Sequence, residues 1–197
     1  MDSKIITNDP LDNFSFDDLE KELNTEKIIG DIYPDNATIK NLYEFTIKQK
    51  YGRLSNRKKA PLFALVDWRG NVLYDLRYWK DDGNPSKGIT FTEEELQKLY
   101  NALKEFDFET IYDEPIRQCK TENSNIIFLY MVAKLSTKYK RNNAWQKEVN
   151  LIDWGCGVKV DFRKWTLDYK QHSKGIRINL DELKSLKLLL KLLFKEE

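Results

Sequence analysis

Val66-Asp67-Trp68-Arg69-Gly70-Asn71-Val72-Leu73-Tyr74-Asp75-Leu76-Arg77-Tyr78-Trp79 occurs a second time, in altered form, as Ile152-Asp153-Trp154-Gly155-Cys156-Gly157-Val158-Lys159-Val160-Asp161-Phe162-Arg163-Lys164-Trp165. The two stretches are 86 residues apart and share two Asp, two Trp, a Val and an Arg in one order. After one inserted residue, Lys87-Gly88-Ile89 matches Lys174-Gly175-Ile176. This degree of agreement indicates that the chain contains two copies of one module.

Each copy predicts four strands followed by a helix. Alternating aromatic or β-branched and polar residues predict strands over 42–51, 61–68 and 72–79, with a short fourth strand over 88–91. The second copy predicts its early strands over 126–138 and 145–154. The expected fold class is therefore α+β, with two ββββα modules.

Capping pairs mark the start of both predicted helices. Thr92 with Glu95, and Asn179 with Glu182, have the spacing of a capping box. Leucines then recur at helical spacing in both copies, at Leu96, Leu99 and Leu103 and at Leu183, Leu186 and Leu190. Residues 183–194 are too apolar for a helix with one exposed side, so we expect this helix to be buried on more than one face, against the first helix.

Charge is distributed unevenly along the chain. Residues 1–41 carry ten acidic residues and four lysines, a net charge of −6; since the whole chain has 33 basic and 32 acidic residues, residues 42–197 carry 29 and 22, a net of +7. An acidic arm on a basic body is typical of nucleic-acid binders, although such an arm can also serve only solubility. We expect a partly disordered acidic arm over 1–38, modules over 39–106 and 126–197, and a connection over 107–125.

Several classes of site are disfavoured. Two cysteines and the single His172 cannot form a four-ligand structural zinc site or a disulfide framework. His172 has no counterpart in the first copy and is interpreted as a loop histidine. No nucleophile–base grouping, phosphate-binding glycine loop or carboxylate cluster stands out, so we expect neither an enzyme nor a cofactor. The chain also has no apolar run of about 20 residues and no signal-peptide pattern at its start, and we expect an intracellular protein without a membrane anchor.

The strand–turn–strand pattern, followed by Lys87-Gly88-Ile89-Thr90 and a helix, resembles the transcriptional coactivator family called positive cofactor 4. The resemblance covers about 60 residues of the first copy and is weaker in the second, where Gly155 and Gly157 occupy the basic turn. It implies a curved four-stranded antiparallel sheet backed by a helix in each module. It also implies that two modules pair through their helices, here within one chain as an intramolecular pseudo-dimer. The Whirly-type arrangement of two ββββα repeats is an architectural relative.

Alternation places Asp75, Arg77 and Trp79 on one face of the third strand, and Tyr74 and Leu76 on the other. Unpaired bases stack on aromatic rings while cations contact their phosphates, so an Arg two residues from a Trp suits a single strand. The alternative interpretation is a salt bridge beside a core tryptophan.

The remaining candidates are tryptophans at the strand ends, which could simply pack there, and basic loops, which could simply be solvated. The candidate nucleic-acid-binding residues are Arg53, Arg57, Lys58, Lys59, Trp68, Arg69, Arg77, Trp79, Lys87, Lys138, Lys140, Arg141, Trp154, Arg163, Trp165 and Lys174. Because the second copy lacks a basic turn, we expect the two copies to bind unequally.

These features favour a sequence-tolerant single-stranded DNA-binding protein that acts in transcription or replication, in the nucleus or another DNA-containing compartment. The richness in Lys, Asn and Ile hints at an AT-rich, viral genome, in which case the compartment is a viral factory. Two alternatives stay open. The same fold could bind RNA, or the modules could form a protein-interaction scaffold whose acidic arm recruits transcription or replication proteins. The pseudo-dimer could act as a monomer or pair again into a homo-oligomer.

Overall fold

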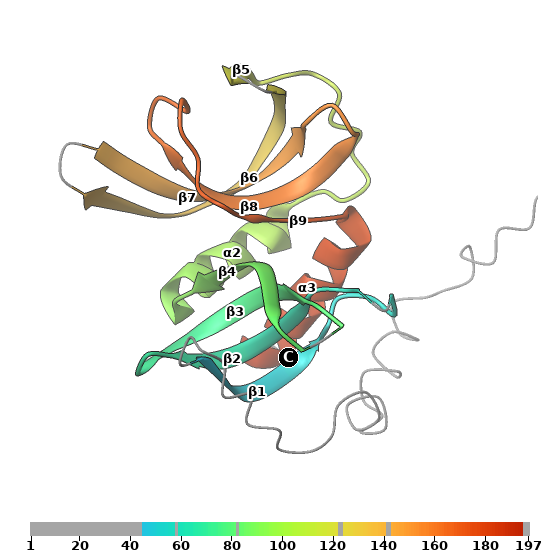
Figure 1. Cartoon of the computed structure of the whole chain (residues 1–197). Coiled ribbons are helices and arrows are strands. Elements are labelled where there is room, and N and C mark those ends of the chain that lie inside the picture. Colours follow the sequence, from blue (N-terminus) through green and yellow to red (C-terminus); the bar gives the residue numbers. More distant parts are fainter. Residues whose placement is uncertain (1–44, 58, 82, 122–123, 141–142, 195–197) are drawn as a thin grey trace, which may run out of the picture. The chain divides into compact units, whose positions relative to one another are not determined.

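A computed structural model describes residues 45–57, 59–81, 83–121, 124–140 and 143–194. These residues form an α+β fold with two antiparallel sheets, one of four strands and one of five, and two helices (Figure 1). The predicted acidic arm over 1–38 and the start of the predicted first strand, residues 42–44, lie outside the described residues.

The first sheet has the strand order β1-β2-β3-β4, as the four consecutive strands of the first copy predict. Its strands are β1 (Phe45–Arg53), β2 (Leu62–Trp68), β3 (Asn71–Trp79) and β4 (Pro85–Phe91). Arg69 and Gly70 join β2 to β3 and both have positive φ, at 52° and 79°, the combination that a two-residue type I′ hairpin requires. Strand β4 begins at Pro85, three residues before the predicted start, because Trp79 pairs with Pro85 across an irregularity in the ladder.

The second sheet has the order β5-β6-β7-β8-β9. Its strands are β5 (Arg117–Thr121), β6 (Ser124–Lys140), β7 (Asn143–Asp153), β8 (Val158–Thr166) and β9 (Ile176–Ile178). The last four correspond to the predicted strands of the second copy. Strand β5 lies within the stretch predicted to be a plain connection, so the structure adds a strand that the repeat does not contain.

Both helices begin where the capping pairs predict. Helix α2 (Glu93–Glu105) has a capping box in which Glu95 N donates to Thr92 Oγ1 and Thr92 N donates to the Glu95 carboxylate. Helix α3 (Leu180–Phe194) is capped in the same way, with reciprocal hydrogen bonds between Asn179 and Glu182. Each box satisfies backbone N–H groups that a helix start otherwise leaves without partners.

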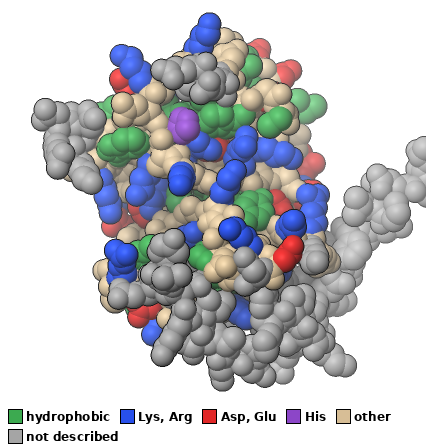
Figure 2. Space-filling model, viewed as in Figure 1, with side chains coloured by type: hydrophobic (Ala, Val, Ile, Leu, Met, Phe, Trp, Pro, Cys, Tyr) green, Lys and Arg blue, Asp and Glu red, His purple; other side chains and the backbone are tan. Residues whose placement is uncertain are grey.

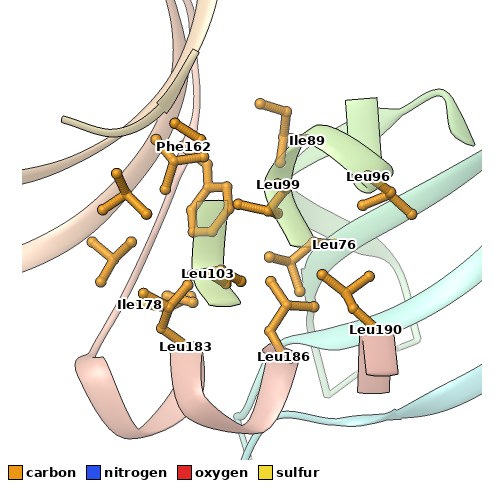
Figure 3. Packing of buried hydrophobic residues seen from close by; sticks show 14 of the residues in the cluster. Leu76, Ile89, Leu96, Leu99, Leu103, Phe162, Ile178, Leu183, Leu186 and Leu190 are labelled. Carbon is orange, nitrogen blue, oxygen red and sulfur yellow. The ribbon is translucent and has the colours of Figure 1, made fainter. Parts of the chain in front are cut away.

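One hydrophobic cluster contains buried residues of both sheets and both helices. Figure 3 shows leucines of α2 and α3 together with Leu76 and Ile89 of the first sheet and Phe162 and Ile178 of the second. The predicted helix faces are buried, and α3 also buries Leu188 and Leu189, so the prediction that it is covered on more than one face is confirmed. The ring of Phe194 in α3 stacks on Tyr100 of α2 at 5.8 Å.

Hydrogen bonds from side chains also join the two copies. The Glu95 carboxylate of α2 accepts hydrogen bonds from Ser136 of β6 and Lys147 of β7. In the reverse direction, the Glu182 carboxylate of α3 accepts from Ser55 of the first copy, at 3.2 Å. Tyr78 of β3 donates its hydroxyl to the Arg177 carbonyl of β9, at 2.8 Å. The capping glutamate of each helix is thus hydrogen-bonded by a serine of the other copy.

Candidate functional site

The two faces of the first sheet have different environments. Leu76 belongs to the cluster shared with the helices and Tyr74 packs against it, as the alternation of β3 predicts. Asp75, Arg77 and Trp79 lie on the opposite face, which we call the first outer face; its apolar floor is formed by the β2 residues Leu62, Ala64 and Val66. Trp68 and Trp79 pack against this floor and are half-buried.

Asp75 fixes the plane of the Arg77 guanidinium. Arg77 Nε and Nη2 donate to the two carboxylate oxygens of Asp75, each at 2.8 Å, and Nη1 donates to the Ser86 carbonyl at 2.8 Å. A Cβ on Gly88 would lie 2.9 Å from Arg77 Cβ and Cγ. The glycine of the Lys-Gly-Ile step is therefore required so that Arg77 can lie across β4, which gives this candidate contact a flat, fixed cation.

Burial of Asp75 raises the pKa of its carboxyl, and the hydrogen bonds and charge of Arg77 only partly offset this effect. Asp161 of the second copy is buried in the same way, and burial raises its pKa despite Arg163 and Arg177. These carboxyl groups are enclosed and serve to hold arginines, so neither is placed to act on a ligand.

A groove of about 320 Å³ lies where the first outer face meets the second copy. Its lining comes from both copies and combines an indole, a guanidinium, two ammonium groups and backbone: Trp68, Leu73, Arg77, Gly88, Ile89, Thr90, Lys164, Ser173 and Lys174. We call it the inter-copy groove. The described residues that line it include three cations and no carboxylate.

The groove brings together the predicted Trp68, Arg77 and Lys174. It also includes Lys164, which the sequence did not indicate because Tyr78 stands at the matching position of the first copy. Lys164 and Ser173 are tied together, since Ser173 N donates to the Lys164 carbonyl at 2.9 Å and Lys164 N donates to Ser173 Oγ at 3.1 Å. This backbone pairing holds Lys174 near Lys164, and both side chains are exposed.

The outer face of the second sheet repeats the arrangement but is closed. Arg163 Nε and Nη2 donate to the two carboxylate oxygens of Asp161, and a Cβ on Gly175 would lie 2.6 Å from Arg163 Cβ. Arg163 is only 8% exposed, and Trp165 is 0% exposed. Two of the predicted contacts of the second copy, Arg163 and Trp165, therefore have almost no exposed surface.

The other tryptophan candidate of the second copy, Trp154, is half-buried and stacks on Trp165, with ring centroids 6.1 Å apart. Arg163 lies over the Trp154 ring at 4.4 Å and its Nη1 is 3.0 Å from His172 Nδ1. His172 lies in the loop between β8 and β9, as predicted, but it packs edge-on against both tryptophans.

The two hairpin tips also differ. Arg69 is exposed at the tip of the first copy. In the second copy, Asp153 Oδ1 accepts hydrogen bonds from the backbone N–H groups of Gly155, Cys156 and Gly157. The tip of the second copy therefore presents its backbone around a carboxylate where the first copy presents a cation.

The other described candidates lie in loops and strands, and none of them lines the groove. Arg53 donates to the Ala60 carbonyl within its own loop. The exposed candidates are Arg57, Lys59, Lys87 and Lys138. Lys58 and Arg141 lie outside the described residues, as does the side chain of Lys140. Tyr139, which we did not predict as a contact, is 82% exposed beside Lys138.

Figure 2 shows Lys and Arg side chains gathered on the face that carries the single histidine, with hydrophobic side chains between them. In the part of the chain that the structure describes, no group of three or more His, Cys, Asp or Glu could hold a metal ion. No described helix is long and apolar enough to cross a membrane. No family model matches the sequence, and no curated protein or solved structure shows significant similarity to it.

Proposed function

We propose that the chain binds single-stranded DNA through the inter-copy groove and the adjoining first outer face. The observation that carries the proposal is the lining of the groove, where Trp68 and three cations from both copies face one space without a carboxylate. A base stacked on an aromatic ring contributes about 1–3 kcal/mol, and the neighbouring phosphates require cations. The groove offers an aromatic ring and cations within one site.

The fixed plane of Arg77 supports a division of roles. A guanidinium that is held flat by a carboxylate presents a face on which a base can stack, and its charge is close to the path of the backbone. Lys164 and Lys174 are flexible point charges suited to phosphates. Because stacking accepts any base, this set of contacts favours binding that tolerates sequence. The resemblance to positive cofactor 4 suggests a role in transcription or replication.

We infer that the two copies form an intramolecular pseudo-dimer. The reciprocal contacts support this inference, since Glu95 accepts from Ser136 while Glu182 accepts from Ser55, each capping one helix and reaching the other copy. The shared cluster of leucines adds an apolar interface between the same elements. The groove depends on this pairing because its cations come from both copies.

The salt dependence of binding tests the proposed groove. Each phosphate that a cation neutralises on a single strand contributes about 0.7 to the slope of log K against log salt. Lys164→Ala combined with Lys174→Ala should therefore reduce the slope for a labelled oligothymidylate by about 1.4. The matched control is Lys170→Ala, which removes an exposed lysine of the same copy that does not line the groove.

An equal slope for the double variant and the control would contradict the proposal. Competition between matched DNA and RNA strands decides the nature of the ligand. The proposal expects DNA to displace RNA, and the reverse order would assign the groove to RNA. Absence of binding to either strand at low salt would favour the scaffold hypothesis instead.

A further inference from the structure

The second outer face is covered by the protein's own chain. Residues 167–175 connect β8 to β9, and Tyr169 within this loop is only 7% exposed. Its ring packs with Phe128 and Trp165 in a cluster on the side of the sheet away from the helices. The first copy has no counterpart, because residues 80–86 between Trp79 and Lys87 include no aromatic side chain.

The Tyr169 ring contacts a cation and an indole. The Arg117 guanidinium of β5 lies over one side of it, 3.6 Å from the ring centroid, and Trp165 lies 5.9 Å away at an interplanar angle of 35°. The Tyr169 hydroxyl donates to the buried Glu148 carboxylate, at 2.9 Å to Oε1. The ring thus contacts a cation and an indole and is hydrogen-bonded at its polar edge, and a nucleobase in a single-strand site makes contacts of the same kinds.

The backbone conformation of the loop positions this ring. Tyr169 has a φ of 57°, a left-handed conformation that is costly for a residue other than glycine. Hydrogen bonds close the loop on itself, from Tyr169 N to the Thr166 carbonyl at 2.9 Å and from Thr166 N to the Gln171 carbonyl at 3.0 Å. The residue with the strained backbone is therefore the one whose aromatic ring fills this face of the sheet, and we call this ring the plug.

We propose that Tyr169 and Arg117 occupy a second single-strand site, in which Tyr169 takes the place of a base on Trp165. This inference rests on the proposed function of the first outer face. The second site would comprise Trp165, Trp154 and Arg163, which match Trp79, Trp68 and Arg77 of the open face. The wild-type chain then binds one strand, and removal of the plug exposes a site for another.

Tyr169→Ala tests the proposal by stoichiometry. Titration of full-length protein with an oligothymidylate of about ten nucleotides, a length within the range of one groove, should give one strand per wild-type chain and two per Tyr169→Ala chain. Acrylamide quenching should also reach more of the tryptophan fluorescence in the variant. Leu167→Ala is the matched control, since Leu167 lies in the same loop, is 50% exposed and should leave the stoichiometry at one.

The outcomes separate the two proposals. If the wild-type protein and a folded Tyr169→Ala variant each bind one strand, the proposal that Tyr169 is a plug is overturned, while the proposed first site is not affected. No strand on the wild-type protein would overturn the proposed function itself. Should Tyr169→Ala not fold, Tyr169→Leu replaces it, because leucine keeps an apolar side chain in the cluster but removes the planar ring; strand occupancy that stays at one in this variant, with unchanged quenching, would also overturn the plug.

Discussion

The pairing of the two copies can be tested at the Glu95–Lys147 ion pair. Lys147 Nζ donates to Glu95 Oε2 at 2.5 Å and to the Thr90 carbonyl at 2.8 Å, so one side chain of the second copy binds two sites of the first. The side chains of Lys147 and Glu95 are only 8% and 5% exposed. Substitution Lys147→Met keeps most of the side-chain volume and leaves the Glu95 carboxylate buried without its cation.

The burial of this pair sets the expected magnitude. Removing one partner of a buried ion pair costs about 3–5 kcal/mol, because the remaining charge is left without compensation. The same helix carries a matched surface pair, Lys98–Glu94, whose side chains are 49% and 78% exposed. Lys98→Met should therefore cost no more than about 0.5 kcal/mol.

Urea unfolding at neutral pH measures both variants. We expect Lys147→Met to lower the free energy of unfolding by several times as much as Lys98→Met. Adding Glu95→Gln to Lys147→Met should recover much of the loss, since the amide keeps the capping box without a buried charge. Equal effects of the two methionine variants would refute the reasoning, because the ion pair would then not join the copies.

The pH dependence has a defined sign. Burial raises the pKa of Glu95, but hydrogen bonds from Lys147 and Ser136 and the charge of Lys147 outweigh it, so the pKa lies below its ordinary value. A lowered folded-state pKa adds stability that is present above the ordinary pKa of about 4.3 and is lost as the pH falls through the folded-state value. Burial also lowers the pKa of Lys147, and the hydrogen bond and charge of Glu95 partly offset this effect. The stability difference between wild type and Lys147→Met should therefore shrink as the pH is lowered from 7 toward 3.

Three further predictions concern the binding face, the arm and the second sheet. Arg77→Ala combined with Trp79→Ala should weaken single-strand binding about tenfold or more in fluorescence anisotropy, since one stacked base contributes about 1–3 kcal/mol, whereas Lys4→Ala should change it little; equal affinities would show that the face is wrong. If the acidic arm competes with nucleic acid for the basic groove, deletion of residues 1–38 should tighten binding, and unchanged affinity would exclude that competition. Gly175→Ala should cost about 1–3 kcal/mol in urea unfolding, because its Cβ would meet both a carbonyl oxygen and an arginine side chain of β8, and a neutral result would show that the close approach is not needed.

The sequence predicted the local structure well because the relevant signals are local. The spacing of Thr92 and Glu95 predicts a capping box at the start of a helix, and the structure contains that capping box. Strand alternation separated Leu76 from Arg77 correctly, since successive side chains point to opposite faces. The Lys-Gly-Ile step that both copies share contains the two glycines, Gly88 and Gly175, that the arginines approach closely in the structure.

The missed features depend on tertiary contacts. Strand β5 has no counterpart in the first copy, so the repeat gave no reason to expect it. Lys164 enters the groove from the second copy, next to Arg77 of the first, and no sequence spacing relates these two residues. Trp165 likewise packs against Tyr169, a loop residue outside both repeated stretches.

The shared Asp-x-Arg-x-Trp pattern therefore reflects a structural requirement of each sheet, whether or not the face forms a binding site. In both copies the aspartate holds the arginine flat, and a glycine (Gly88 of β4, or Gly175 just before β9) leaves room for it, whether the face is open or closed. Repetition of the pattern alone would have predicted two equivalent sites. What differs is the covering: Trp79 keeps part of its surface, whereas Trp165 is buried beneath the chain's own aromatic ring. If the chain binds single strands as proposed, the loop after the third strand of each copy should decide how many strands bind, and substitutions in that loop should change this number without changing the sheet beneath.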